Sequence, residues 1–494
     1  MGGETEIGLT SSKDQYIDGV AIAEKLPEFI ANNPLTLEDF DPLFLKRCDT
    51  VERFRGEVLN FVSGFFQGGD RFYYDVKHVE ISWRESDNVF DLAASDHATT
   101  RILDAIFKKF QRAHPEYGEI SGFKDNAAVH PDSGKLTTWG AHENYLMDRD
   151  AWEKRDLLIP FLVTRQIFAG PGAFKTDPID QERQTKSFAN YFELSERAGH
   201  IQTIESLESM SNRAIINTRD EPHINNQRYR RLHLIVGDHN ICAYTTALKF
   251  GTTHLVLRLL EEDESFSVSP LQDPVQSLQS LSLQPTLGLS LKIPHETRTA
   301  LQIQRIYLNR AKELFYGENG QTDWILDNWE FVLNQLSIKG IPKSLVGLID
   351  RFTKEEILRR ILREFDLDLS KAEDRFHLKG YDKSYANIDM SWGLPFVYPG
   401  NTVYFPSNPD EVLEKIFRPS YGSRSSLRSF PLTFYPEEIS TVSWNSVSFK
   451  NGKGKLDLND IVFTDPGIMQ DLFDRKPSLE DFLAFCDNKG LLKR

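Results

Sequence analysis

The sequence predicts an α+β fold whose strands form an antiparallel sheet. Polar and apolar residues alternate in 71–82, which is the period of a strand with one buried face, and 230–240 is also predicted as a strand. Apolar residues recur at helical spacing in 101–113 and 245–263, which predicts helices beside the strands. With 494 residues the chain is too long for one ordinary core, so we expect two domains, or one large domain with an appendage.

The first predicted elements are strands that carry acidic residues. The opening stretch GGETEIGL is predicted as a strand in which Glu4 and Glu6 point to one face, because alternate residues of a strand share a face. Residues 71–82 are predicted as a further strand, and a change of phase at Val76–Lys77 indicates a bulge or bend within it. Helices and loops are expected between these two strands.

The remaining chain is predicted as helices and strands, with a boundary near residue 409. Residues 264–294 are rich in Ser, Gln, Leu and Pro, which favours a linker or a surface excursion. The composition changes at about residue 409, so we expect a domain over 1–408 and a small C-terminal domain over 409–494, with SRSSLRS (423–429) as a basic turn. A turn that enters a strand is predicted at 133–147 and a further strand at 230–240. Further helices are predicted at 156–170, 297–315, 322–338 and 353–366.

Composition limits the expected partners. The formal net charge is −15, and the field of such a protein repels duplex nucleic acid and acidic membranes. Cys48, Cys242 and Cys486 are far apart in the sequence, so we expect neither a disulfide framework nor a thiolate zinc site, and a reducing cytoplasm fits. The opening residues lack the pattern of a secretory signal. The longest apolar stretch, near 157–163, is too short to span a membrane.

Local motifs point away from two common kinds of nucleotide site. The sequence contains neither GxxxxGK[ST] nor GxGxxG, so a P-loop or Rossmann site is not indicated. The predicted strands instead carry Glu4, Glu6, Asp75 and Glu80, and such hard oxygen ligands suit Mg²⁺. Residues 216–233 gather arginines and histidines that could hold phosphate. The residues alone leave two interpretations open: a metal–nucleotide site on an antiparallel sheet, or charges scattered over the surface.

Several long stretches resemble one known family. They are FLVTRQIFAGPG (161–172), GAHENYLM (140–147), INTRDEPH (216–223), RYRRLHLIVGDHN (228–240) and LKFGTTHLVL (248–257). They look like the family of Pup ligases and Pup deamidases/depupylases, bacterial enzymes that act on a small ubiquitin-like protein modifier. The resemblance implies the fold of glutamine synthetase, a curved antiparallel sheet packed with helices, plus a small C-terminal domain. It also implies ATP and Mg²⁺ as cofactors, Pup and pupylated proteins as partners, and a monomer.

The resemblance also implies roles for individual residues. The family opens with a Gly-x-Glu-x-Glu-x-Gly strand, matched here by Gly2 to Gly8, and its catalytic aspartate corresponds to Asp75. The implied metal ligands are Glu4, Glu6, Tyr73, Glu80, His142 and His223, and the implied nucleotide contacts are Arg71, Arg219 and Trp444. The sequence departs from the family at Val79 and Ile81, which replace a proline and a tyrosine, and at Trp83, which replaces a small residue.

The family has two branches that share one site. The ligase phosphorylates the C-terminal glutamate side chain of Pup and joins it to a lysine, whereas the hydrolase deamidates a C-terminal glutamine or cuts the isopeptide bond. The spacing of Asp75, His78 and Glu80 resembles the hydrolase, as do 301–311 and 443–449. One feature counts against the hydrolase, which has a long insertion after the first strand: the 68 residues between Glu6 and Asp75 are intermediate in length, and residues 30–56 could be a shortened or altered form of that loop. We therefore expect a depupylase or deamidase, with a ligase, a catalytically silent Pup-binding regulator and a small-molecule carboxylate–amine ligase as alternatives.

Overall fold

The structure is a computed structural model that describes ten stretches of the chain. Its contacts divide the chain into two compact units. The described residues are 1–13, 17–75, 77–129, 136–180, 187–209, 211–225, 227–284, 288–338, 342–397 and 403–493. The first unit combines Met1–Gly122, Glu221–Arg230 and Ser407–Arg494. The second unit combines Phe123–Asp220 and Arg231–Pro406. Residues 407–494 therefore group with the N-terminal segment, and a separate C-terminal domain over 409–494 stays a prediction.

The first unit contains an antiparallel run of strands in the order β1-β7-β6-β5-β4. Their bounds are β1 (Gly2–Ser11), β4 (Phe61–Val62), β5 (Phe65–Phe66), β6 (Arg71–Asp75) and β7 (His78–Ser82), and β8 (Ile120–Phe123) pairs with β1. A short pair, β2 (Leu35–Thr36) and β3 (Val58–Leu59), is also antiparallel. Residues 30–56, predicted as an altered loop, hold the end of α1, the strand β2, the helix α2 and short 3₁₀ turns.

Seven helices of the first unit lie within its described residues. They are α1 (Ile17–Asn32), α2 (Pro42–Leu45), α3 (Val89–Ala113), α13 (Pro409–Phe417), α14 (Ser425–Phe434), α15 (Pro466–Arg475) and α16 (Leu479–Asn488). Helix α1 contacts β1, β4, β6 and β7. Helix α3 begins twelve residues before the predicted start at 101 because the side chain of Asn88 caps it, accepting from the N–H groups of Phe90 and Asp91.

The prediction of one bent strand over 71–82 was wrong. The chain reverses between Asp75 and His78, which face each other as partners in the antiparallel pair of β6 and β7. Lys77 has φ +96°, a conformation that a tight hairpin turn requires and that few residues with a Cβ adopt. The change of phase in the sequence therefore marks a turn, and the reversal brings both halves of the stretch onto neighbouring strands.

The C-terminal residues of the first unit enclose an apolar cluster of their own. Strands β19 (Ile439–Ser443), β20 (Ser446–Phe449), β21 (Lys455–Asp457) and β22 (Leu492–Lys493) pair in that order. Together with α14, α15 and α16 they bury the cluster, which Phe65 of β5 also joins. The predicted basic turn at 423–429 was wrong, because residues 425–429 begin helix α14, and Arg424 and Arg428 are buried against the carboxylate of Glu85.

The second unit is built on a mixed set of strands and a group of helices. Its strands are β9 (Ala127–Val129), β10 (Leu136–Thr138), β11 (Ala141–Asp148), β12 (Ala173–Phe174), β13 (Phe192–Glu193), β14 (Thr203–Ser206), β15 (Ala214–Asn217), most of β16 (Tyr229–Leu234), β17 (Ser290–Ile293) and β18 (Glu296–Thr299). Strands β14, β15, β16 and β11 are neighbours in that order, and β14 and β15 run parallel. Its helices are α4 (Ile159–Thr164), α5 (Gln166–Ala169), α6 (Ala243–Glu262), α7 (Pro274–Ser282), α8 (Ala300–Phe315), α9 (Gly320–Leu336), α10 (Asp350–Glu364), α11 (Ala372–Tyr385) and α12 (Leu394–Val397).

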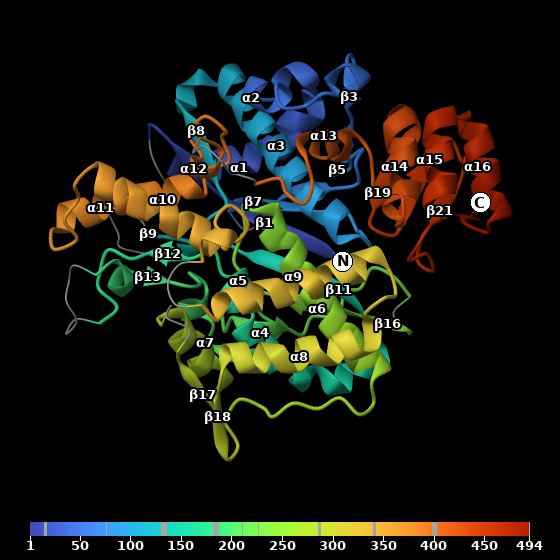
Figure 1. Cartoon of the computed structure of the whole chain (residues 1–494). Coiled ribbons are helices and arrows are strands. Elements are labelled where there is room, and N and C mark those ends of the chain that lie inside the picture. The colour runs from blue at the N-terminus through green and yellow to red at the C-terminus, as the bar shows by residue number, and fades with distance from the viewer. Residues whose placement is uncertain are drawn as a thin grey trace. The chain divides into compact units, whose positions relative to one another are not determined.

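The helices of the second unit follow the predictions closely in one region. Helices α6, α8 and α9 contact one another (Figure 1) and correspond to the helices expected at 245–263, 297–315 and 322–338. The predicted linker at 264–294 was partly wrong. It contains α7, whose apolar residues Leu278 and Leu281 are buried, and the strand β17. No helix within the described residues is long and apolar enough to cross a membrane.

Candidate functional site

An acidic face forms where β1, β7 and β6 lie side by side in the first unit. Residues opposite each other in antiparallel strands point to the same face. Glu4 is opposite Ser82 and Glu6 is opposite Glu80. In the next pair of strands, Arg71 is opposite Ser82, Tyr73 is opposite Glu80 and Asp75 is opposite His78. The register therefore gathers most of the predicted site residues on one face, which we call the acidic face: Glu4, Glu6, Arg71, Tyr73, Asp75, His78, Glu80 and Ser82.

The opposite face of the same strands is apolar and fixes this register. Ile7, Phe72, Val79 and Ile81 are all fully buried. A shift of one residue would move this apolar set to the acidic face, which is strongly disfavoured. The two departures from the family pattern, Val79 and Ile81, thus occupy positions that point away from the site. They leave the placement of Glu80 between them unchanged.

Glu80 is the most buried carboxyl of the acidic face, with 4 % of its surface exposed. The hydroxyl of Tyr73 donates to Oε1 of Glu80 at 2.6 Å and lies 3.3 Å from Oγ of Ser82. Burial, followed by the charges of Glu4 and Glu6, raises the pKa of Glu80 well above its usual range. Burial and the same acidic surroundings also raise the pKa of the Tyr73 hydroxyl. Burial and the neighbouring carboxylates therefore favour the neutral form of Glu80 in the protein alone.

His78 belongs to the acidic face, although the sequence argument used it only for spacing. Its Nε2 lies 3.5 Å from Oε1 of Glu6. Burial acts to lower the pKa of His78, but Glu6 and Asp75 outweigh it and the pKa is raised. The alternation of His78, Glu80 and Ser82 in the sequence already placed them on one face, so this signal could have added His78 to the candidate site.

The acidic face fits a divalent cation. One ligand atom from each of Glu6, His78 and Glu80 can be chosen so that all three lie within 4.8 Å of one another. Carboxylate oxygens are the ligands that Mg²⁺ prefers, and Mg²⁺ usually shares its coordination with phosphate oxygens. A cation here would also stabilise the ionised form of Glu80. The residues present therefore fit the Mg²⁺ that the family resemblance implies, and Glu4, Glu6, Tyr73 and Glu80 stay its predicted ligands.

Asp75 differs from the other carboxylates because it is exposed, at the end of β6. Its charge still reaches the interior of the face, since it contributes to the raised pKa values of both His78 and Glu80. An exposed carboxylate beside a cation-binding group is accessible to a large substrate. This geometry is compatible with the catalytic role predicted for Asp75.

Arg71 connects the acidic face to the C-terminal cluster. Its guanidinium lies 4.8 Å from the ring centre of Tyr73 and 5.9 Å from that of Phe65. The ring of Phe65 in turn meets the indole of Trp444 edge-on, with centroids 5.1 Å apart. The two residues predicted to contact the nucleotide in this unit, Arg71 and Trp444, are thus joined through a single phenylalanine.

The other predicted contacts lie elsewhere. His142, on β11 of the second unit, is buried and meets the ring of His233 edge-on at 5.1 Å. Arg219 is exposed in the second unit, where its backbone N–H donates to Oδ1 of Asn217 at 3.0 Å. His223 is exposed in the first unit with φ +53°, and its carbonyl oxygen accepts from Arg424. The metal and nucleotide roles of these three residues stay predictions.

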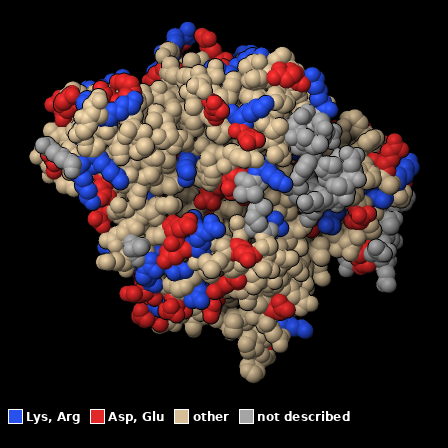
Figure 2. All heavy atoms as spheres, turned by 180° about the vertical axis from the view of Figure 1, so that it is seen from behind, with Lys and Arg blue, Asp and Glu red and all other residues tan. Residues whose placement is uncertain are grey.

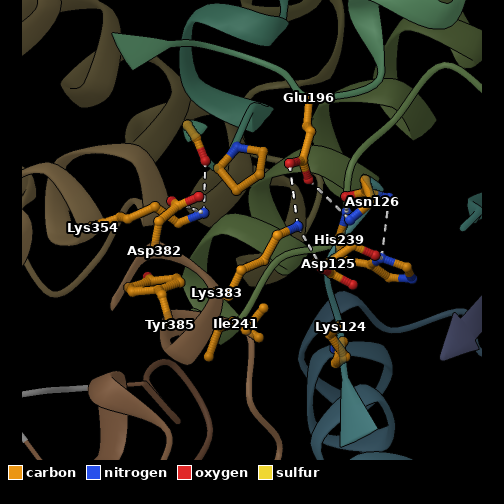
Figure 3. A pocket seen from close by; sticks show the side chains of 13 residues that line it. Lys124, Asp125, Asn126, Glu196, His239, Ile241, Lys354, Asp382, Lys383 and Tyr385 are labelled. Atoms are coloured by element: carbon orange, nitrogen blue, oxygen red, sulfur yellow. Dashed lines mark hydrogen bonds and ion pairs between the residues drawn. The ribbon is translucent and has the colours of Figure 1, made fainter. Parts of the chain in front are cut away.

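A second group of charges surrounds a small cavity in the second unit (Figure 3). Lys383 points between two acids there, with Nζ 2.6 Å from Oδ2 of Asp125 and 3.5 Å from Oε1 of Glu196. The backbone N–H groups of Asn126 and Ala127 donate to Glu196 at 3.2 and 3.1 Å. The cavity measures about 20 Å³, which is room for about one water molecule. It is therefore a structural ion network and too small to hold a substrate.

Acidic and basic side chains are interspersed over the face that Figure 2 shows. Nucleic-acid-binding surfaces instead gather Lys and Arg on one face. The expectation from the net charge of −15, that nucleic acid is not a partner, stays a prediction.

Comparison with known proteins gives one consistent family. The model of the family described as "Pup-ligase protein" matches residues 1–448. The chain is 35 % identical over 376 residues to a Pup–protein ligase of Kineococcus radiotolerans, covering 74 % of this chain and 79 % of that protein. It is 31 % identical over 395 residues to a Pup deamidase/depupylase of Mycolicibacterium smegmatis, covering 78 % and 75 %.

Solved structures agree with the sequence relatives. The chain resembles the Pup ligase PafA in its crystal structure with Pup, at a TM-score of 0.73 and 26 % identity, over 100 % of this chain and 95 % of that one. It also resembles PafA in complex with ADP, at a TM-score of 0.69 and 26 % identity, over 89 % and 95 %. The predicted α+β class, with a large sheet and many helices, is confirmed. The family model, the relatives and the shared fold together show that the chain belongs to the Pup-ligase family.

Proposed function

We propose that this chain is an ATP- and Mg²⁺-dependent hydrolase acting on Pup, which releases Pup from lysine side chains or deamidates its C-terminal glutamine. The observation that carries the proposal is the acidic face, where Asp75 stands exposed beside Glu6, His78 and Glu80. Relatives that are 31–32 % identical to this chain over 395–399 residues include Pup deamidase/depupylases. The spacing from Asp75 to His78, which pair across the hairpin of β6 and β7, favours the hydrolase branch of the family.

The reaction requires the cleavage of a carbon–nitrogen bond in a side-chain amide of Pup. The carboxylate of Asp75 attacks the amide carbon, or removes a proton from the water that does so. The amine or ammonia leaves with a proton, and the oxygen of water ends in the new carboxylate. Arg71 and Trp444 bind the nucleotide, and Glu4, Glu6, Tyr73 and Glu80 hold Mg²⁺. Bound Mg²⁺ and nucleotide phosphates supply positive charge and oxygen ligands that orient the substrate group beside Asp75.

A Pup–protein ligase is the second candidate, favoured by the 35 % identity to the Kineococcus radiotolerans ligase and by the similarity to PafA. In that reaction ATP transfers a phosphoryl group to the glutamate side chain, and a lysine amine displaces phosphate. Asp75 would then accept a proton from the lysine. The acidic face serves both reactions, so the difference lies in whether water or the amine reaches the acyl carbon.

The two candidates differ in their use of ATP. Purified protein is incubated with Mg²⁺, ATP and a model protein carrying Pup on one lysine, and products are read by gel and mass spectrometry. The hydrolase is expected to release free Pup over many turnovers with far less than one ADP for each Pup. New conjugate and one ADP for each bond, obtained from free Pup ending in glutamate and a lysine-bearing protein, would instead establish the ligase.

A further inference from the structure

The acidic face continues into a row of alternating aromatic rings and guanidinium groups in the first unit. The row begins at Tyr73 and Arg71 and passes to Phe65. The guanidinium carbon of Arg428 lies 5.3 Å from the ring centre of Phe65 and 5.0 Å from that of Trp444. Each contact falls within the range of a cation–π interaction. The row therefore links the two residues predicted to contact the nucleotide, Arg71 and Trp444, by direct contacts.

Hydrogen bonds and an ion pair hold the side chain of Arg428 in place within this row. Its side chain is fully buried, and it donates to Oε1 of Glu85 at 3.1 Å and to the carbonyl oxygen of Trp444 at 2.8 Å. Its other terminal nitrogen donates to Oε2 of Glu85. Burial alone would raise the pKa of Glu85, but Arg428 and Arg424 lower it well below its usual range. A paired and hydrogen-bonded guanidinium of this kind holds its geometry, because a planar fork loses little freedom on binding.

Trp444 itself is only half-buried, between β19 and β20. A half-exposed indole without such support would lose rotamer freedom when a ligand binds, which weakens binding. The contacts of Arg428 with both the ring and the carbonyl of Trp444 restrict the indole before the ligand binds. Phe65 supports the same indole from the side of Arg71.

We propose that Arg428, held by Glu85, and Phe65 are positioning residues that fix the indole of Trp444 relative to Arg71, and thereby set the affinity for the nucleotide. This inference rests on the proposed function, in which Arg71 and Trp444 bind ATP. Neither Arg428 nor Phe65 touches Asp75 in the described structure, so they act on nucleotide affinity and leave the chemical step unchanged once nucleotide saturates the site.

The chain offers matched controls for both residues. Arg424 is also buried and binds the same carboxylate, Glu85, at 2.8 Å, but no aromatic ring lies against it among the described residues. Phe449 belongs to the same apolar cluster as Phe65 and carries no contact in the row. Arg428→Lys and Phe65→Leu are therefore compared with Arg424→Lys and Phe449→Leu.

The test is calorimetric titration of ADP with Mg²⁺ into the wild type and the four variants, with KM for ATP and kcat measured in parallel. Arg428→Lys and Phe65→Leu are expected to weaken ADP binding roughly three- to tenfold, to raise KM and to leave kcat unchanged. The controls are expected to stay within twofold of the wild type. Equal weakening by variants and controls, or no weakening by either row variant, overturns the inference while the proposed function stands.

A spectroscopic readout keeps the test independent of turnover and of any one variant. In protein labelled with 5-fluorotryptophan, the ¹⁹F signal of Trp444 is assigned with Trp444→Phe. That signal is expected to shift or broaden in Arg428→Lys and Phe65→Leu but not in the controls, and an unchanged signal overturns the positioning role. Phe65→Leu carries the test alone if Arg428→Lys does not fold. A wild-type protein that binds no ADP contradicts the proposed function, and with it the link from positioning to affinity.

Discussion

The hydroxyl of Tyr73 donates to Oε1 of Glu80 at 2.6 Å across the hairpin of β6 and β7. Glu80 is buried and also feels the charges of Glu4 and Glu6. The hydrogen bond acts to lower the pKa of Glu80, but burial and the neighbouring charges outweigh it. The pair therefore marks the point where the protein concentrates negative charge for a cation to neutralise.

Replacing Glu80 should change metal binding and stability in opposite directions. We expect Glu80→Gln to stabilise the metal-free protein by about 1 kcal/mol near neutral pH, because the amide removes a buried carboxyl that ionises unfavourably. We expect the same variant to weaken Mg²⁺-dependent ADP binding at least about tenfold. Thermal melting with and without Mg²⁺, and calorimetry, measure both effects.

Glu24→Gln, at an exposed position on α1, is the control for the Glu80 variant. It should change neither the melting temperature of the metal-free protein nor the effect of Mg²⁺. A Mg²⁺-induced rise in melting temperature that is as large in Glu80→Gln as in the wild type would remove Glu80 from the metal site.

Replacing Asp75 should slow the chemical step and leave nucleotide binding almost unchanged. Because Asp75 is exposed and its proposed role is chemical, Asp75→Asn is expected to lower kcat by roughly 10²–10⁴-fold and to leave the affinity for ADP within about twofold. Steady-state kinetics and calorimetry measure the two quantities. Asp49→Asn, another exposed carboxyl of the first unit, should retain full activity. Wild-type turnover in Asp75→Asn would exclude Asp75 from the mechanism.

The ion network around Lys383 in Figure 3 should contribute to folding and not to catalysis. Lys383→Met removes the shared counter-charge of the partly buried Asp125 and Glu196, although Glu196 keeps Lys379 at 3.5 Å. We expect this loss to cost roughly 3 kcal/mol of unfolding free energy. Denaturant titration measures the loss. Lys371→Met, at an exposed lysine just before α11, should be neutral within about 0.5 kcal/mol. A loss below about 1 kcal/mol for Lys383→Met would show that the network is solvated.

Glu193 should make stability depend on pH. Burial raises the pKa of Glu193 to about 7. The charge of Lys175 acts to lower this pKa, whereas the charge of Glu196 acts to raise it. The folded state therefore holds a proton that the unfolded state, with a pKa of about 4.3, has lost. Protonated Glu193 therefore makes its full contribution to the free energy of unfolding below about pH 4, and this contribution is lost as the pH rises to about 7.

The matching variant, Glu193→Gln, should remove this dependence. Between about pH 4.5 and 7 the wild type should lose stability because its unfolded state releases a proton that the folded state keeps. The free energy of unfolding of the variant minus that of the wild type should therefore rise by up to about 1.4 kcal/mol for each pH unit. Denaturant titration at several pH values measures the difference, with the exposed Glu373→Gln as a control. A difference that is flat over this window would mean that Glu193 is ionised throughout it in the folded protein.

The sequence predicted the elements with strong periodicity and the residues that share a strand face. Helices α8 and α9 match their predicted spans because each carries a continuous apolar stripe. Helix α6, which is buried on nearly all sides, also matches its predicted span. The acidic face also follows from the sequence, since alternation alone places Glu4 with Glu6, and His78 with Glu80. What alternation could not give is the register that sets Glu6 opposite Glu80, because pairing depends on the buried face and the turn.

The errors arose where tertiary contacts override local composition. The stretch 423–429 looked like an exposed basic turn, yet Arg424 and Arg428 are buried because Glu85, far away in sequence, neutralises both. The hairpin at Lys77 contains no Asn-Gly or Asp-Gly pair, which is the usual signal for a two-residue turn. The grouping of 407–494 with the N-terminal segment depends on long-range contacts that no local pattern records.

The measurement that tests the account most directly is hydrolysis of pupylated substrate in H₂¹⁸O, with the released Pup analysed by mass spectrometry. A hydrolase that uses Asp75 is expected to place one ¹⁸O atom in the side-chain carboxylate of each Pup over many turnovers, with ATP largely intact and with no label when Asp75→Asn is used. Release of Pup that requires ADP and phosphate and carries no ¹⁸O from water would contradict the account, because it would show a ligase running in reverse.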